Sequence, residues 1–145
     1  PVTFEDEQRA CVVQEALSWL HTPYHHHARI KGVGVDCAQL LCAVFEATGL
    51  VPPIETGAYP TDWHLHRNEE LFSGWMARYA REPHAALPMR LGEVCLFRYG
   101  RTFSHGAIYV GDGLLVHAYL KRGVILSRIT DEPLAGRDLQ RWSFW

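Results

Sequence analysis

Residues 104–120 read SHGAIYVGDGLLVHAYL, two apolar runs of strand type on either side of a Gly-Asp-Gly turn. A hairpin with a three-residue loop at residues 111–113 would pair Ala107 with His117. This register gathers the aliphatic side chains on one face of the hairpin and places His105 and His117 on the other, whereas a two-residue loop would mix the two sets. The hydrophobic pattern therefore predicts two histidines that are diagonal neighbours across the strands, roughly 5–8 Å apart.

A cysteine upstream completes a catalytic set with these histidines. Asp36 and Cys37 stand where a glycine-rich loop turns into an apolar helical run, so we expect Asp36 to be the N-cap and Cys37 to lie in the first turn. The helix dipole and the free N–H groups of that turn are expected to lower the thiol pKa toward neutrality and to bind a developing oxyanion. A histidine base needs a partner that holds its ring and tautomer. The residues therefore predict Cys37 as nucleophile, His105 as base and His117 as the orienting partner; the alternative they leave open is a small buried cysteine with two unrelated histidines.

The pattern along the rest of the chain predicts helices first and strands afterwards. A first amphipathic helix is expected over residues 4–20, with Ala10, Val13, Leu17 and Leu20 at helical spacing. Further helices are expected over residues 37–48 and 71–79, and strands over residues 94–99, 104–110, 114–120, 124–129 and 138–145. This order predicts an α+β fold, N-terminal helices packed on a mostly antiparallel sheet of about five strands. Residues 1–145 are expected to form a single domain.

The composition narrows the partners. The 145 residues are 48% hydrophobic and 21% charged, with a formal net charge of −2, which is typical of a globular domain. Without a block of basic residues, no nucleic acid partner is expected. Apolar runs fall short of the roughly 18 residues that span a bilayer, and the N-terminal residues are polar and acidic, so we expect no membrane insertion and synthesis in the cytoplasm without a signal peptide. The four cysteines are expected to be free thiols.

Other histidines raise the question of a metal. Residues 25–27 are three consecutive histidines, and His64 and His66 flank a leucine. Consecutive histidines point in different directions and rarely chelate one ion together, and no helical His-x-x-x-His spacing accompanies them. The sequence therefore predicts neither a metal nor a cofactor, and it leaves open whether these histidines border a substrate cleft or lie in solvated loops.

The motifs in their order along the chain resemble the NlpC-type cell-wall cysteine peptidases, particularly the short versions carried by tailed phages and gene-transfer particles. The resemblance rests on Thr22-Pro23-Tyr24, Asp36-Cys37-Ala38-Gln39-Leu40, Gly92-Glu93-Val94, His105-Gly106-Ala107-Ile108-Tyr109-Val110-Gly111 and His117-Ala118. It implies a papain-like fold, the same three catalytic residues, and Tyr24 together with Asp36 on the substrate or oxyanion side of the site. Ala38 and Gln39 depart from the serine and glycine usual in the family, which puts substrate preference in question.

The resemblance also implies a function. We expect a peptidoglycan endopeptidase that hydrolyses amide bonds of stem peptides, between D-γ-glutamate and a diamino acid, through a thioester on the cysteine. The expected partners are peptidoglycan stem peptides and the proteins of a phage tail or tail-like particle. Such a particle would carry the peptidase to the cell wall. Two alternatives belong to other classes: a non-catalytic structural or adaptor subunit of a tail tip or baseplate, and an acyltransferase that uses the same residues.

Overall fold

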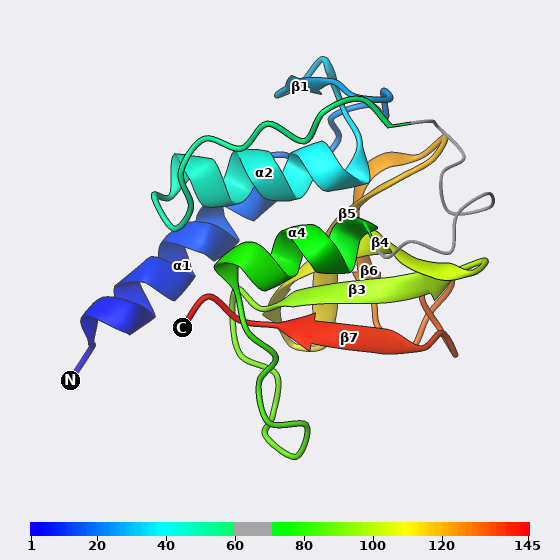
Figure 1. Cartoon of the computed structure of the whole chain (residues 1–145). Helices are drawn as coiled ribbons and strands as arrows, with labels where there is room; N and C mark the ends of the chain where they lie inside the picture. Colours follow the sequence, from blue (N-terminus) through cyan, green and yellow to red (C-terminus); the bar gives the residue numbers. More distant parts are fainter. Residues whose placement is uncertain (60–70) are drawn as a thin grey trace.

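The computed structural model describes residues 1–59 and 71–145, and within these residues the chain forms three α-helices and seven strands (Figure 1). In chain order they are α1 (Phe4–Leu17), β1 (Arg29–Ile30), β2 (Gly34–Val35), α2 (Cys37–Ala47), α4 (Leu71–Tyr79), β3 (Val94–Tyr99), β4 (Thr102–Gly111), β5 (Leu114–Tyr119), β6 (Gly123–Arg128) and β7 (Leu139–Trp142). Helices precede the main sheet, so the predicted α+β class is confirmed. The predicted strand ends differ from the observed ones by up to three residues.

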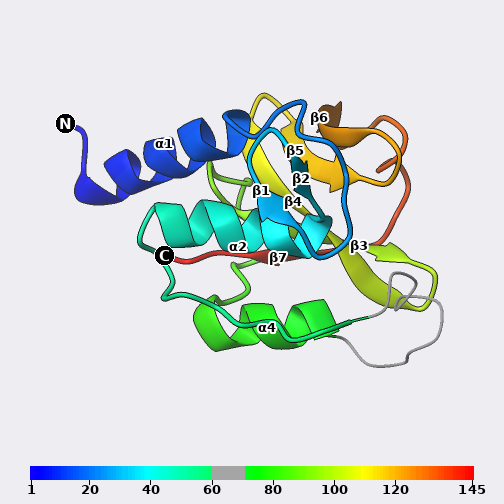
Figure 2. The same cartoon turned by 90° about the horizontal axis from the view of Figure 1, so that it is seen from above.

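The last five strands form one antiparallel sheet in the order β6-β5-β4-β3-β7, and the helices lie together on one of its faces (Figures 1 and 2). That face packs Leu96, Ile108 and Val116 against the helices. The opposite face forms a second apolar cluster in which Leu134, from the segment before β7, covers Phe97. The sheet is therefore buried on both sides. Among residues 1–59 and 71–145, no helix has the length and apolar character needed to cross a membrane.

Helix α1 begins with a capping box in which the Thr3 side chain accepts from the Asp6 N–H and the Asp6 carboxylate accepts from the Thr3 N–H. Its buried residues are Arg9, Val12 and Ala16, and Ala10 is exposed. Leu17 and Leu20 of the predicted apolar side pack against the core. The fully buried positions of the helix, however, are Val12 and Ala16, and the exposure of Ala10 shows that this part of the prediction was wrong.

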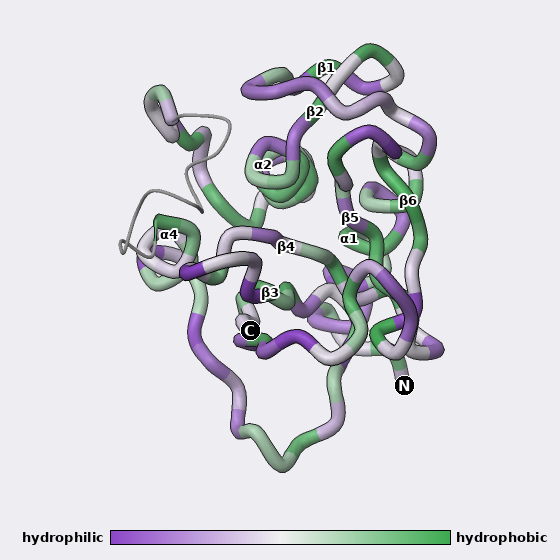
Figure 3. The backbone as a smooth tube through the Cα atoms, turned by 90° about the vertical axis from the view of Figure 1, so that its right-hand side faces the viewer, coloured by the Kyte–Doolittle hydropathy of each residue, from purple (hydrophilic) through white to green (hydrophobic). Residues whose placement is uncertain are grey.

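Helix α2 is buried nearly all round, as its apolar sequence predicts. The Asp36 carboxylate caps its N-terminus by accepting from the Gln39 N–H, which confirms the predicted cap. Figure 3 shows this helix as a largely hydrophobic coil enclosed between the β1–β2 hairpin and the sheet. The β1–β2 hairpin itself was not predicted, because its strands are only two residues long.

The β4–β5 hairpin has the predicted register but not the predicted loop. Ile108 pairs with Val116 and Tyr109 with Leu115, a register whose continuation sets Ala107 opposite His117. The turn is shorter than expected: Gly111 pairs with Leu114, and the two turn residues, Asp112 and Gly113, have φ of 54° and 73°. Such a pair of positive φ values is typical of a tight type I′ turn. The extra residue that was expected in the loop is accommodated instead in β4, as a β-bulge at position 110. Because of this bulge, the side chains before it face the sides of the sheet that the sequence predicts.

Gly123, at the start of β6, lets the chain between α1 and α2 approach the sheet. Val124 exchanges main-chain hydrogen bonds with His21 and Thr22. The backbone of Gly123 has φ +77°, and a Cβ at this position would lie 2.6 Å from the Thr22 carbonyl oxygen. A side chain is therefore opposed both by the backbone conformation and by a neighbouring main-chain atom.

Gly123→Ala should lower the free energy of unfolding by about 3 kcal/mol or more, because backbone strain and overpacking add. Gly113→Ala is the matched control, since Gly113 has φ +73° but nothing within 4 Å of an added Cβ; it should cost about 1 kcal/mol. Urea denaturation of both variants measures the difference. Equal losses would show that the close approach to Thr22 carries no energetic weight.

Candidate active site

The thiol of Cys37 lies against the main chain of β4. Cys37 is the first residue of α2, and only 8% of its surface is exposed. β4 pairs with β5 only from Ile108 to Gly111. Before Ile108, main-chain groups of β4 bind the thiol: the Sγ donates to the Ser104 carbonyl oxygen at 3.6 Å, and the Gly106 backbone hydrogen-bonds to the sulfur. The thiol is thus held by the main-chain groups on both sides of His105.

The two histidines of the hairpin are in direct contact, as the register predicts. His105 Nε2 and His117 Nδ1 are 2.7 Å apart, and the ring planes are nearly perpendicular, at 85°. Both side chains are buried, His117 completely. Because His105 uses Nε2 for this contact, its Nδ1 is the ring nitrogen that His117 does not occupy. The structure thus joins His105 to His117 and sets the Cys37 thiol against the backbone on both sides of His105, and the roles of nucleophile, base and orienting residue stay predictions.

Aromatic rings surround the His105 imidazole. The rings of Tyr99 and Tyr119 lie edge-on to it, with centroids 5.2 Å and 5.8 Å away. The Arg137 guanidinium stacks on Tyr99 at 3.5 Å from its centroid and donates to the Pro133 carbonyl. Edge-on aromatic packing restricts ring rotation without supplying a competing acceptor. His105 is therefore held in one orientation by its neighbours as well as by its hydrogen bond.

Burial keeps both histidines neutral. It holds the pKa of His105 well below the ordinary value of 6.5, and the nearby His117 and Arg137 act in the same direction. Burial likewise lowers the pKa of His117 to about 4, with a further contribution from Arg122. Desolvation disfavours the imidazolium because its charge loses water. Near neutral pH each ring therefore carries a single proton.

The thiol pKa departs from the sequence-based expectation. Burial raises the pKa of Cys37 to about 12, and the Asp36 carboxylate adds to the rise. Backbone hydrogen bonds from Gly106, Ala38 and Cys37 itself lower it, but by less. The expected shift toward neutrality was wrong, because the helix N-terminus favours a thiolate only where desolvation does not outweigh it. At rest the site holds a neutral thiol beside a neutral imidazole.

Tyr24 lies close to Cys37. An isolated bridge pairs it with Val35, two residues before Cys37. Burial raises the pKa of its phenol, and both Cys37 and Asp36 raise it further, which reflects their proximity. The hydroxyl is therefore protonated at neutral pH and can act as a hydrogen-bond donor beside the thiol.

Asp36 is engaged within the chain. It is 1% exposed, and besides the Gln39 N–H it accepts from the His27 N–H at 2.7 Å and from the Tyr59 hydroxyl at 2.6 Å. These donors come from the helix, the loop before it and the segment after it. Asp36 thereby fixes the loop that presents Cys37. Its expected place beside the substrate stays a prediction.

Gln39, the departure from the family pattern, turns away from the thiol. Its side chain is buried, accepts from Arg29 at 2.9 Å, and donates to Thr56 and to the Tyr59 hydroxyl at 3.0 Å and 3.3 Å. Arg29 also pairs with Glu46 of α2 at 2.6 Å. The extra bulk of Gln39 is therefore used to attach the segment after α2 to the helix.

Two of the three consecutive histidines also bind the segment after α2. His26 and His27 hydrogen-bond through Nε2 to the carbonyl oxygens of Tyr59 and Gly57, at 2.9 Å and 2.8 Å. Within residues 1–59 and 71–145, no group of histidine, cysteine, aspartate and glutamate side chains could hold a metal ion. His64 and His66 lie outside the described residues. The contacts of His26 and His27 give these residues a structural use.

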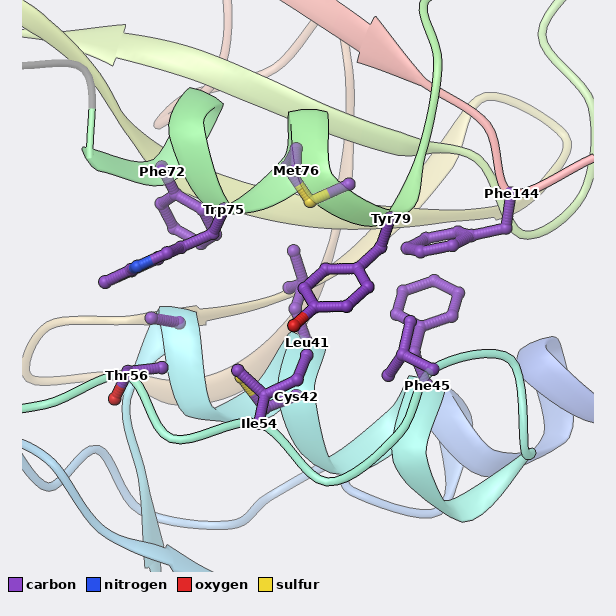
Figure 4. A pocket seen from close by; sticks show the side chains of 12 residues that line it. Leu41, Cys42, Phe45, Ile54, Thr56, Phe72, Trp75, Met76, Tyr79 and Phe144 are labelled. Carbon is purple, nitrogen blue, oxygen red and sulfur yellow. The ribbon is translucent and has the colours of Figure 1, made fainter.

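An apolar pocket lies between α2 and α4 (Figure 4). Leu41, Phe45 and Met76 are among its lining residues, and it adjoins the nucleophile through Ala38. The Cys42 thiol also lines it, and burial raises the pKa of this thiol to about 11. A neutral thiol among apolar side chains offers little reactivity. The pocket therefore adds no second reactive thiol to the site.

Two residues of the site were missed by sequence reasoning. The Ser127 hydroxyl lies 2.8 Å from His117 Nε2, and the Tyr59 hydroxyl binds Asp36. Alternation along residues 124–129 would have placed Ser127 on the histidine face once β6 was registered on β5. No local signal marks Tyr59, because it reaches Asp36 from an irregular segment.

The fold and the site define a class: an α+β domain in which a cysteine at a helix N-terminus meets a histidine pair on an antiparallel sheet. A sequence model of the NlpC/P60 family matches residues 21–142, and the chain belongs to this family. Its α+β fold is papain-like.

Known proteins share both sequence and fold with this chain. The probable endopeptidase Rv2190c of Mycobacterium tuberculosis strain H37Rv is 32% identical over 110 residues, which are 76% of this chain and 23% of that protein. The chain thus corresponds to about a quarter of the length of that relative. NlpC1 from Trichomonas vaginalis has a TM-score of 0.68 at 14% identity, over 99% of this chain and 47% of that one. The peptidoglycan hydrolase RipB from M. tuberculosis has a TM-score of 0.63 at 19% identity, over 95% and 65%.

Tyr59→Phe should lower the free energy of unfolding by about 2 kcal/mol, because the buried Asp36 carboxylate loses a donor at 2.6 Å. Tyr79→Phe is the control, since Tyr79 is 37% exposed and its loss should stay within about 0.5 kcal/mol. Thermal or urea unfolding provides the comparison. A Tyr59 variant as stable as the control would exclude a structural role for this hydroxyl.

Proposed function

We propose that the chain is a cysteine endopeptidase that hydrolyses amide bonds in the stem peptides of peptidoglycan, at the bond between D-γ-glutamate and a diamino acid. The observation that carries the chemistry is the arrangement of Cys37 against β4 on both sides of His105, whose far nitrogen is bound by His117. The substrate class is supported by family membership and by the similar proteins, an endopeptidase and a peptidoglycan hydrolase. The scissile bond comes from the family resemblance of the motifs.

The first half of the reaction forms a thioester. As the Cys37 sulfur attacks the substrate carbonyl carbon, His105 Nδ1 takes the thiol proton, and the C–O double bond becomes an oxyanion. The N–H groups at the start of α2 and the Tyr24 hydroxyl donate to this oxyanion. The imidazolium of His105 then gives its proton to the departing amine as the carbon–nitrogen bond breaks.

The second half releases the acid. A water molecule loses a proton to His105 Nδ1 and attacks the thioester carbon, and the collapse of the second oxyanion expels the Cys37 sulfur. The sulfur recovers the proton from His105. His117 remains bound to Nε2 throughout, so the ring keeps its orientation in both halves.

The neutral resting pair suits this sequence of steps. A thiol with a pKa of about 12 is not a free thiolate in the closed site, so its proton leaves when a substrate carbonyl is in place to accept the sulfur. His105 is equally neutral and can receive that proton. Coupling deprotonation to attack restricts the reactivity of the thiol toward other electrophiles.

Digestion of purified peptidoglycan and of a γ-D-glutamyl–diamino acid peptide, followed by mass analysis of the products, tests the proposal. The wild-type chain should release fragments ending in D-glutamate, whereas Cys37→Ser and His105→Ala should lose nearly all turnover. Cys11→Ser is the control, because Cys11 is exposed on α1 and should leave hydrolysis unchanged. Absence of fragments from the wild-type chain would favour the non-catalytic adaptor. Fragments with other ends would show that the chain hydrolyses a bond other than the proposed one.

The lowered histidine pKa predicts the acid limit of the activity. His105 acts as a base only when neutral, and its pKa lies well below 6.5, so it stays neutral as the pH falls through that value. The acid limb of kcat/KM should therefore be centred below pH 6.5. A pH–rate profile from about pH 4 to about pH 8 measures it. A limb centred at or above the ordinary histidine pKa would mean that the site opens to water before catalysis.

We also propose that the domain acts as part of a phage tail or tail-like particle, which the family resemblance supports. Such a particle would bring a peptidase made in the cytoplasm into contact with the cell wall. Sedimentation of particles from a producing culture, followed by detection of the chain in the particle fraction, tests this association. Recovery only in the free protein fraction would contradict it.

A further inference from the structure

The histidine pair continues into a third side chain. His117 Nε2 lies 2.8 Å from the Ser127 hydroxyl, while its Nδ1 lies 2.7 Å from His105 Nε2. Ser127 is buried, at 8% exposure. On β6 it lies two residues from Ile125, the residue paired with His117, and so faces the same side of the sheet. The hydrogen-bonded chain therefore runs across three strands, from β4 through β5 to β6.

A single proton between the two histidines allows two arrangements, because a neutral imidazole carries one N–H. In the first, His105 donates from Nε2 to His117 Nδ1, and His117 donates from its own Nε2 to the Ser127 oxygen. In the second, Ser127 donates to His117 Nε2, His117 donates from Nδ1 to His105 Nε2, and the His105 proton lies on Nδ1. Both arrangements satisfy the same distances.

The two arrangements differ at His105 Nδ1, the nitrogen that takes the thiol proton in the proposed function. In the first, His105 Nδ1 is bare and can accept the Cys37 proton. In the second, Nδ1 already carries a proton, so His105 is not a base toward the thiol. The first arrangement also accommodates the imidazolium, because every N–H of the chain then points toward an acceptor. Only the arrangement in which Ser127 accepts is productive.

We propose that Ser127 is a positioning residue that accepts the His117 Nε2 proton and thereby keeps the proton of His105 on Nε2 and its Nδ1 free for Cys37. Its effect on turnover rests on the proposed function, whereas its effect on the histidine tautomers does not. Ser127 touches the orienting residue and not the thiol. It therefore acts on proton transfer and leaves substrate binding unchanged.

Nitrogen-15 NMR of the histidine rings tests the tautomers directly, with the His117 signals among the nine histidines assigned from the His117→Gln variant. In the wild-type chain both His105 and His117 should be protonated on Nε2. In Ser127→Ala the His117 N–H loses its acceptor, and since buried N–H groups without acceptors are rare, the Nδ1-protonated form of His117 should become populated. Ser127→Thr, which keeps a hydroxyl, should restore the wild-type pattern.

Hydrolysis supplies the second measurement. Ser127→Ala should lower kcat by roughly 10- to 100-fold, by analogy with the outer hydrogen-bonding partners of metal-bound histidines, with KM unchanged; Ser127→Thr should recover most of it. Ser73→Ala is the matched control, because it removes a hydroxyl bonded to Gln140 at 2.7 Å, away from the histidines. It should leave kcat and the ring signals unchanged.

The outcomes separate this proposal from the proposed function. Wild-type His117 protonated on Nδ1, or identical ring signals and kcat in wild type and Ser127→Ala, would overturn the role of Ser127 even if hydrolysis depends on Cys37. If the histidine tautomers shift in Ser127→Ala but the wild-type chain releases no peptidoglycan fragments, the positioning role is supported and the proposed function is contradicted.

Discussion

The buried carboxylate of Asp36 joins three parts of the chain: the start of α2, the loop before it and the segment after it. Its oxygens accept from the first turn of α2, from the loop at His27 and from the Tyr59 hydroxyl, all at 2.8 Å or less. A carboxylate excluded from water is tolerated only when such donors replace its hydration. The requirement works in both directions: the charge needs the loop and the segment after α2 in place, and these in turn determine where α2 begins. The position of the nucleophile is thus a consequence of satisfying one buried charge.

The two faces of the sheet present different groups of β4. Toward the helices, β4 presents Ile108 and the bare backbone of Gly106, where an added Cβ would lie 2.9 Å from the Phe72 ring and 3.0 Å from Leu41. This close approach brings the thiol to the strand backbone. Toward the other face, β4 presents His105 among aromatic rings. The thiol meets the strand backbone itself, where main-chain groups on either side of His105 bind it.

The fold, the helix start at Asp36 and the contact between His105 and His117 could be predicted because each depends on a local pattern. Alternation in residues 104–120 specifies the register of the hairpin whatever its turn, since a shift by one residue would bury the wrong face. The turn itself was mispredicted, because a bulge and a shorter loop give the same alternation. Ser127 follows from the alternation of residues 124–129 only once β6 is registered on β5, and Tyr59 binds Asp36 from an irregular segment that no local pattern marks. The pKa of the Cys37 thiol was mispredicted for a related reason. The sequence indicates a helix N-terminus, which lowers a thiol pKa, but the desolvation that raises the pKa by more arises only when β4 packs against α2.

The bulge in β4 also bears on how this hairpin can vary among relatives. It contributes one residue to the strand, and that residue sets whether the side chains before it face the helices or the histidine cluster. Deleting it alone, or inserting one residue beside it, would exchange the faces of His105 and its aliphatic neighbours. Lengthening the turn at Asp112 and Gly113 instead leaves both strands in register. Natural insertions and deletions in the hairpin should therefore accumulate at its tip, and within the strand they should come in pairs.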